Sequence, residues 1–267
     1  MTPPFPTRSE SASADSLVVA TLNIRNRADR WHERASLLIE QLVELQPDII
    51  GLQEIRRPGG QGNWILREVN RRLPPEAPLY TAHYAWKTGL RRYWEGLAIV
   101  TRLPIVDSAR FDLGGGSRVA QRVRVGLPDG GWLAFYNTHL HHAAEDDVLR
   151  REQAERIADW IERSPDEFVV LVGDFNSEPE TDVVQLLTDR FQSAYRIAHG
   201  TEPDLTAPTP LNATEAARFS TIDYIFVDPR LDVQHGWLTF TSAAADDERL
   251  YASDHFGIAA RIVVPSR

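Results

Sequence analysis

The chain has 267 residues, of which 42% are hydrophobic and 25% are charged, as is ordinary for a soluble globular protein. It contains no cysteine, which excludes disulfides and thiolate metal sites. Its formal net charge of −9 disfavours non-specific binding of polyanions through bulk charge.

The basic residues are nevertheless concentrated in one segment. Residues 56–92 contain eight basic and two acidic side chains, a local charge of +6, which leaves −15 for the rest of the chain. This segment is either a solvated basic face or a surface that receives a phosphate-bearing substrate. Trp86, Tyr93 and Trp94 lie within it or next to it, as a base-stacking surface would require.

The first sixteen residues are rich in proline, serine and small polar residues and lack the apolar core of a signal peptide. We predict a flexible tail over residues 1–16 and a single domain over residues 17–267. No apolar stretch approaches the roughly 18 residues that a membrane span needs. We therefore expect a monomeric, cytoplasmic protein, unless a signal has been removed.

Hydrophobic patterning predicts the elements of the N-terminal half. In chain order they are strand 17–24, helix 33–46, strand 48–54, helix 63–73 and strand 97–101. The strands are short apolar runs, whereas the helices place their apolar residues at helical spacing and end before proline.

The C-terminal half begins with a predicted β-hairpin, because residues 118–127 and 132–138 alternate around a Pro-Asp-Gly-Gly turn. The elements that follow are an amphipathic helix at 145–163, strand 168–176, a helix that starts at Pro179, and strands 222–227, 233–240 and 256–264. No linker divides the chain, so strands with intervening helices predict one α+β domain of packed sheets.

Polar residues recur at the ends of these apolar strands. They lie in the motifs TLN (21–23), LQE (52–54), NTH (137–139), GDFN (173–176) and SDH (253–255), and Asp223 lies inside a further apolar run. Buried charges are costly unless they are paired or bind a metal, so their repetition predicts a shared site. Carboxylates suit Mg²⁺, histidines transfer protons near neutral pH, and asparagine donates to phosphate oxygens. This combination indicates hydrolysis of phosphate esters.

Together with WEGLAIVTRLP (94–104) and IDYIF (222–226), the ordered motifs resemble the endonuclease/exonuclease/phosphatase superfamily from about residue 17 to residue 264. The resemblance implies a four-layer α/β/β/α sandwich, with two packed, mostly antiparallel sheets flanked by helices and a site at one rim. It also implies a metal-dependent phosphoric ester hydrolase, most similar to the deoxyribonuclease/sphingomyelinase branch, that uses magnesium or alternatively manganese.

The resemblance assigns a metal side and a histidine pair. Glu54 matches the principal magnesium ligand, assisted by Asn23, and Asp254 matches a further carboxylate near the metal. His255 matches the histidine that contacts the scissile phosphate or activates water, and Asp223 matches the carboxylate that orients it.

The remaining assignments concern water, leaving group and substrate. Asp174 and Asn176 match the pair near the attacking water and the phosphate. His139 matches the general acid of the deoxyribonuclease and sphingomyelinase branches, and Glu95 matches the glutamate that deoxyribonucleases pair with it. Tyr93, in a Tyr-x-Glu order with Glu95, is a candidate substrate-binding residue.

Arg118 is a second candidate for binding substrate, whereas His141 and His142 are interpreted as a solvated loop and not as zinc ligands. The expected substrate is a phosphodiester, with nucleic acid as one candidate. The alternative is an enzyme on the same scaffold that acts on a phosphomonoester or on a lipid head group. A hypothesis of a different functional class is a non-catalytic binding module that retains the fold. Loops 56–94 and 196–220 are expected to select the substrate.

Overall fold

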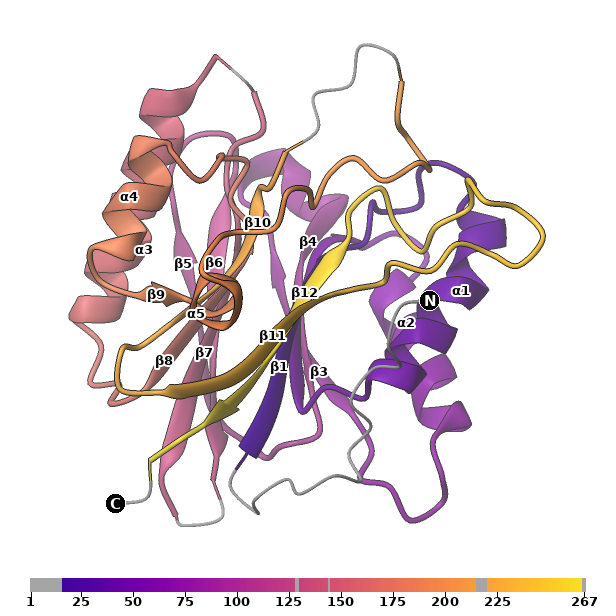
Figure 1. Ribbon diagram of the computed structural model, residues 1–267, viewed down its shortest axis with the longest axis horizontal. Helices are drawn as coiled ribbons and strands as arrows, with labels where there is room; N and C mark the ends of the chain where they lie inside the picture. The colour runs from indigo at the N-terminus through magenta and orange to yellow at the C-terminus, as the bar shows by residue number, and fades with distance from the viewer. Residues whose placement is uncertain (1–15, 128–129, 144, 215–219, 266–267) are drawn as a thin grey trace.

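The computed structural model describes residues 16–127, 130–143, 145–214 and 220–265. The predicted tail lies outside these residues, apart from Ser16, which begins the first strand. Two six-stranded sheets pack face to face, and helices cover their outer surfaces (Figure 1). In the described part of the chain, no helix is both long enough and apolar enough to cross a membrane.

The first sheet has the strand order β11-β12-β1-β2-β4-β3 and draws on both ends of the chain. Its strands are β1 (Ser16–Asn23), β2 (Ile49–Arg56), β3 (Thr81–Trp86), β4 (Glu95–Thr101), β11 (Asp232–Thr239) and β12 (Gly257–Val263). Only the central β1 and β2 pair in parallel, and the other neighbours are antiparallel. These two strands are the apolar, β-branched runs that the sequence marked as buried.

The second sheet has the order β5-β6-β7-β8-β10-β9 and comes from one continuous segment of the chain. Its strands are β5 (Ile105–Asp112), β6 (Val119–Gly126), β7 (Trp132–His139), β8 (Val169–Asp174), β9 (Gln192–Ser193) and β10 (Asp223–Val227). Strands β6 and β7 form the predicted hairpin, and β7 pairs in parallel with β8.

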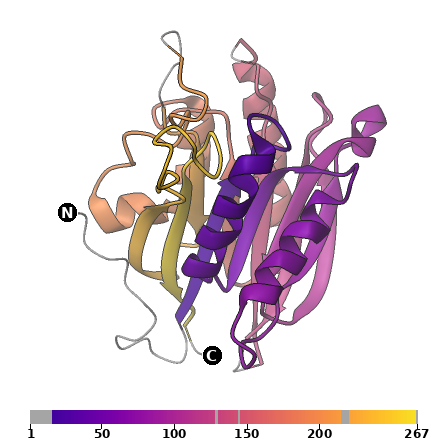
Figure 2. The same ribbon diagram turned by 90° about the vertical axis from the view of Figure 1, so that its right-hand side faces the viewer.

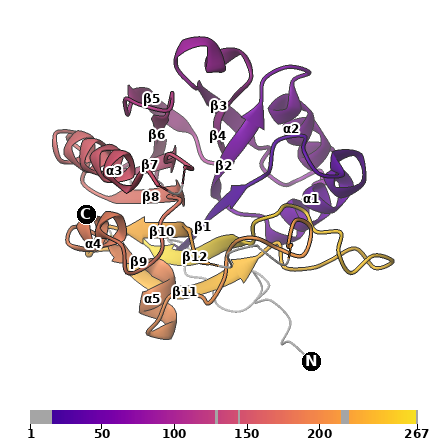
Figure 3. The ribbon, with the colours of Figure 1, turned by 90° about the horizontal axis from the view of Figure 1, so that it is seen from above.

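Helices complete the four layers, as Figures 2 and 3 show. The first sheet is covered by α1 (Trp31–Leu45) and α2 (Gln61–Arg72), and the second by α3 (Asp147–Glu162) and α4 (Asp182–Thr188). The short α5 (Ala194–His199) packs on β11, and η1 (Gly89–Tyr93) precedes β4. The predicted α+β sandwich of mostly antiparallel sheets is confirmed.

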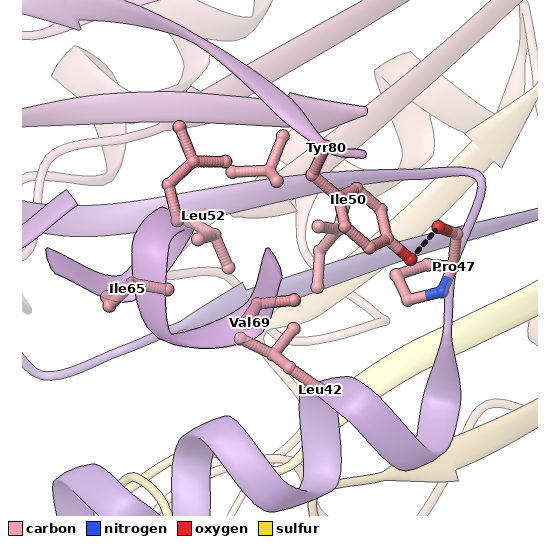
Figure 4. Close-up of a pocket in the computed structure, with 9 residues that line it drawn as sticks. Leu42, Pro47, Ile50, Leu52, Ile65, Val69 and Tyr80 are labelled. Atoms are coloured by element: carbon pink, nitrogen blue, oxygen red, sulfur yellow. Dashed lines mark hydrogen bonds between the residues drawn. The ribbon is translucent and has the colours of Figure 1, made fainter. Parts of the chain in front are cut away.

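Apolar side chains fill all three interfaces between layers. Phe135 and Val170 of the second sheet meet Ile49 and Ile258 of the first in the central core, and all four are at most 1% exposed. Between the first sheet and its helices, a small apolar cavity of about 10 Å³ remains, where the Tyr80 hydroxyl donates to a backbone carbonyl at 2.7 Å (Figure 4). The ordinary close packing of a globular core therefore fixes the sheets against each other.

A buried polar bridge joins the two sheets directly below one rim. Asn137 on β7 is fully buried, and its amide donates to the carbonyls of Leu52 and Ala98 at 3.1 and 3.0 Å. Gln53 on β2 donates in turn to the Asn137 oxygen at 2.7 Å. The sheets lie so close here that a Cβ on Gly51 would come within 2.6 Å of Val172, which explains the glycine.

Several elements were not predicted, namely β3, β5, β9, α5 and η1. The helix expected to start at Pro179 begins instead at Asp182, because Thr181 occupies the position before the first turn. Neither difference alters the layers.

Candidate active site

The topology brings every predicted strand-end residue to one rim. Strands β1, β2, β7 and β8 end at this rim, and their antiparallel neighbours β4, β10 and β12 begin there. In the second sheet, Asp174 is directly opposite both His139 and Asp223 in the strand register. Residues from 23 to 255 are thereby collected into one site.

His255, Asp223 and Asp174 form a buried chain of contacts. His255 Nδ1 lies 2.8 Å from Asp223 Oδ2, and its Nε2 lies 4.0 Å from Asp174 Oδ2. Burial acts to lower the pKa of His255, but the neighbouring charges of Asp223, Asp254 and Asp174 outweigh it and raise the pKa well above its usual range. The raised pKa favours the protonated imidazole, whose Nε2 lies on the side of Asp174.

Asp174 is the residue at which most of the site meets. Its Oδ2 accepts a hydrogen bond from the Asn23 side chain at 2.9 Å and lies 3.4 Å from His139 Nε2. Its Oδ1 accepts from the backbone N–H of Asn176 at 2.9 Å. Burial, followed by the charge of Asp223, raises the pKa of Asp174 to about 7. A carboxylate with this pKa can take up a proton near neutral pH.

The predicted metal ligands lie on the first-sheet side of the rim. Glu54 follows a bulge in β2 and has a left-handed φ of 58°, a conformation that is costly for a non-glycine residue and that often marks a functional site. Among the described residues, its carboxylate accepts one long hydrogen bond, from Asn23 at 3.4 Å. Burial and the charges of Glu95 and Asp254 raise its pKa, and the charge of His255 acts against them. A crowded carboxylate that forms no ion pair with a lysine or arginine in the described part of the chain suits a hard divalent cation.

The compact group Asp174, Asp223 and His255 also has ligand atoms within 4.8 Å of one another. The Nδ1 of its imidazole is already engaged by Asp223 at 2.8 Å, which leaves Nε2 as the free ring nitrogen. The set of Glu54, Asn23 and Asp254 stays a prediction, and Asp254 also lies 3.2 Å from the Arg25 guanidinium. Mg²⁺ needs only one or two protein carboxylates, since substrate and water supply its other ligands.

His139 does not have the partner that the resemblance implied. Its Nδ1 is buried and has no hydrogen-bond partner among the described residues. Glu95 instead receives an ion pair from Lys87 and a 3.2 Å hydrogen bond from Asn26. The expectation of a Glu95–His139 pair is therefore wrong, because a lysine with nine-tenths of its side chain buried occupies the glutamate.

Cationic and imidazole groups gather in the loops next to Glu95 and His139. They are Lys87, Arg118 and His142, which we call the cationic cluster. Arg118 is 3% exposed and donates to His142 Nδ1 at 3.0 Å. Burial lowers the pKa of His139 well below its usual range, and the charges of Arg118 and Lys87 lower it further. His139 is consequently neutral in the free protein.

Two predicted residues lie at the edge of this arrangement. Asn176 has a left-handed φ of 49°, and its amide donates to the Leu140 carbonyl at 3.2 Å, which fixes it beside Asp174. Tyr93 is 50% exposed and is engaged by the neighbouring Arg92, whose guanidinium donates to its hydroxyl at 2.7 Å. The structure therefore does not bring Tyr93 into contact with the buried acids.

The sequence patterns did not predict that Lys87, Asn26 and Arg25 belong to the site. Each lies in a loop or turn just beyond a strand, where it carried no strand-end signal of its own. Lys87 was visible only as part of the basic segment. A positive charge directly after an apolar alternating stretch is the signal that could have found it.

Buried carboxylates, two histidines and asparagines at the rim of two packed sheets define a hydrolase that acts on phosphate esters. The chain belongs to the endonuclease/exonuclease/phosphatase family, whose model matches residues 20–255. Members of this family are phosphoric ester hydrolases. Among curated protein sequences, none matches the chain significantly.

Solved structures of the same fold cover nearly the whole chain. An endonuclease/exonuclease/phosphatase from Bacteroides vulgatus superposes with a TM-score of 0.76 and 22% identity over 94% of this chain and 99% of the other. The Bacteroides thetaiotaomicron mannosyl-6-phosphatase gives 0.74 and 22% over 93% and 100%. TDP2 from D. rerio, complexed with a single-strand DNA product, gives 0.77 and 20% over 93% and 99%. At these identities the likeness establishes the fold.

Proposed function

We propose that this chain is a magnesium-dependent phosphodiesterase, with manganese as an alternative ion. The observation that carries the proposal is the convergence on Asp174, whose Oδ2 lies 2.9 Å from Asn23, 3.4 Å from His139 and 4.0 Å from His255. A carboxylate with a pKa of about 7 between two histidines is the equipment for moving protons around a phosphoryl group.

Asp174 is the proposed general base. It takes a proton from the attacking water at its Oδ2. The backbone N–H of Asn176 and the side chain of Asn23 hold the carboxylate in place. His255, kept cationic by Asp223, donates from Nε2 to a phosphoryl oxygen and stabilises the charge that develops there.

His139 is the proposed general acid, which protonates the departing oxygen. It must first gain a proton, because it is neutral in the free protein. Two causes of that neutrality are the cations Arg118 and Lys87, and an anionic substrate would offset both. Substrate binding would thus raise the pKa of His139 when the acid is needed.

The metal ligands in this proposal are Glu54, Asn23 and Asp254. A bound divalent cation supplies Lewis-acid stabilisation of the phosphoryl oxygens. The chain's own part is to hold Glu54 in its strained backbone conformation and to keep the amide of Asn23 between Glu54 and Asp174.

The test is a panel of bis(p-nitrophenyl) phosphate, p-nitrophenyl phosphate, and single- and double-stranded DNA, each with Mg²⁺, with EDTA, and with Glu54→Ala. Glu44→Ala, at an exposed glutamate of α1, is the matched control. We expect Mg²⁺-dependent diester cleavage that only Glu54→Ala abolishes. Cleavage of the monoester alone would replace the proposal with a phosphatase, and activity that survives both EDTA and Glu54→Ala would contradict it.

A further inference from the structure

The cationic cluster contains a guanidinium whose hydrogen-bonding capacity is not used. Arg118 is 3% exposed, and its Nε and Nη1 are buried without a hydrogen-bond partner among the described residues. Leaving two charged donors unpaired costs free energy, because their hydration is lost without replacement. Such an arrangement calls for an explanation, and a bound anion that supplies the missing acceptors is one.

Burial lowers the pKa of Arg118, and the charges of Asp174, Glu95 and Glu54 offset this only in part, since none of these acids accepts a hydrogen bond from Arg118 among the described residues. Glu95 accepts from Lys87 and Asn26, so both of its oxygens are already engaged. The group that does accept from Arg118 is the imidazole of His142, at 3.0 Å. Burial and the charge of Arg118 lower the pKa of His142, so this acceptor is neutral. A neutral acceptor thus occupies a position where a buried guanidinium would ordinarily hold an anion.

His142 can give way to an anion. It is exposed and lies in the loop after β7, whereas Arg118 and Lys87 are fixed at the ends of β6 and β3. Lys87 is 8% exposed, and the backbone N–H of the next residue, Thr88, donates to the carbonyl of Ser117 at 3.3 Å, which places the two segments that carry Lys87 and Arg118 side by side. An anion between the two cations would be attracted by both.

The position of the cluster tells which part of a substrate it meets. His139 is the last residue of β7, and Arg118 directly precedes the neighbouring strand β6, whereas the Nε2 of His139 lies 3.4 Å from Asp174 on the opposite neighbour, β8. If His139 protonates the departing oxygen, the leaving group extends away from Asp174 and toward the cations. This step rests on the proposed function.

We propose that Arg118 and Lys87 form a binding site for a second, non-scissile phosphate carried by the leaving group. The site selects substrates in which a phosphate follows the bond to be cleaved. Such a phosphate is present in a polynucleotide strand and in a small bisphosphorylated metabolite. Both sources offer the same group to the same two side chains.

The first test measures binding and does not depend on turnover. Inorganic phosphate is titrated by calorimetry in EDTA into the full chain and into Arg118→Met, Lys87→Met and Arg124→Met. Arg124 is the matched control, since it lies on the same sheet and is paired with Asp166 at 2.6 Å and Asp107 at 3.0 Å. We expect binding to weaken by about tenfold or more in the first two variants, the scale of a lost charge-assisted contact, and to persist in Arg124→Met.

Asn176→Ala separates this site from the scissile position. Phosphate binding that disappears in Asn176→Ala but survives in Arg118→Met would overturn the proposal. Thermal melting excludes a merely structural role, because removing a buried charge whose described side-chain hydrogen-bond partner is a neutral imidazole should leave the melting temperature of Arg118→Met unchanged or raise it. A large fall in that temperature, with phosphate binding lost, would mark Arg118 as structural and would also overturn the proposal.

The second test compares substrates that differ by one phosphate. The thymidine dinucleotide TpT is compared with pTpT and TpTp, and fructose 6-phosphate with fructose 1,6-bisphosphate. We expect the extra phosphate to raise kcat/KM by about tenfold in one of these series, which identifies the source, and this gain to vanish in Arg118→Met and Lys87→Met. An equal loss on both members of a pair would place the two residues at the scissile phosphate instead. If no substrate is turned over, the proposed function fails. The calorimetry alone then decides whether Arg118 and Lys87 bind a second phosphate.

Discussion

The two sides of the rim are built on opposite principles. On the carboxylate side, formed by Asn23, Glu54, Asp174, Asp223 and His255, the polar groups bind mainly one another, at distances from 2.8 Å upward. In the cationic cluster of Lys87, Arg118 and His142, donors outnumber acceptors and two guanidinium nitrogens are left over.

This contrast indicates what each side can bind. The carboxylate side has an excess of negative charge, and among the described residues Glu54 forms no ion pair with a lysine or arginine, so this side is suited to a metal ion. The cationic cluster lacks an anion, so it is suited to substrate. His139 separates the two sides and touches the first of them through Asp174.

Removing His139 should have the largest effect, because it is the proposed acid between the two sides. We expect His139→Ala to lower kcat on an unactivated diester by about 10²- to 10⁴-fold. His141→Ala is the control, since His141 pairs with Asp146 at 3.0 Å outside the buried acids, and it should retain activity. A loss of less than tenfold in His139→Ala would remove the acid role.

Glu54→Gln tests whether Glu54 on the carboxylate side serves metal binding or stability. We expect metal-dependent activity to fall by about 10²- to 10³-fold, the scale of losing one preorganised electrostatic contact. Stability should behave in the opposite sense. In EDTA the variant should unfold at the same or a higher urea concentration than the parent, because Glu54 is destabilised by burial and by the charges of Glu95 and Asp254. A clear loss of stability in EDTA would show that Glu54 is structural.

Asn137→Ala tests the buried bridge that holds the two sheets in register beneath the carboxylate side. The variant removes the side-chain donor to the carbonyls of Leu52 and Ala98 and one of the three acceptors of the Gln53 amide. We expect a loss of about 1–3 kcal/mol in the free energy of unfolding, measured by urea denaturation. Asn63→Ala, at an exposed position, should change it by less than about 0.5 kcal/mol. Equal effects at both positions would argue against the bridge.

The corresponding bridge beneath the cationic cluster should respond weakly to pH. Gln121 on β6 contacts both the Nδ1 and the backbone carbonyl of His83 on β3, at 2.8 and 2.7 Å. Burial lowers the pKa of His83 in the folded protein, so the unfolded chain takes up the proton first. Stability should therefore fall as the pH drops below about 6.5, the ordinary histidine value. His83→Gln should flatten this part of the stability profile, and an unchanged slope would contradict the assignment.

The residues of the carboxylate side could be predicted from the sequence, because they lie at the ends or beginnings of apolar strands. Asn23, His139 and Asp174 each end a strand, and the packing of those strands forces them to one rim. The cationic cluster was not readable in the same way. Arg118 and Lys87 lie in the loops before β6 and after β3, and the packing of β3 on β6 brings these loops together. The partner of Glu95 likewise depends on that tertiary contact.

The strands that escaped prediction share a weak apolar signal. Strand β5 alternates between half-buried and exposed residues along its whole length and contains Asp, Ser and Ala at positions where central strands have Val or Ile. Strand β3 begins at an exposed threonine and also lies at a sheet edge. Edge strands bury fewer side chains, so patterning that detects burial passes over them.

The way the two sheets draw on the chain has a consequence for synthesis on the ribosome. All strands of the second sheet lie between residues 105 and 227, so that sheet can be complete while the rest of the chain is still being made. The first sheet cannot be complete before β12 has entered between β11 and β1. His255 directly precedes that last strand. The site in the nascent protein therefore stays incomplete until the segment from Asp254 through β12 has been made and has paired with β1.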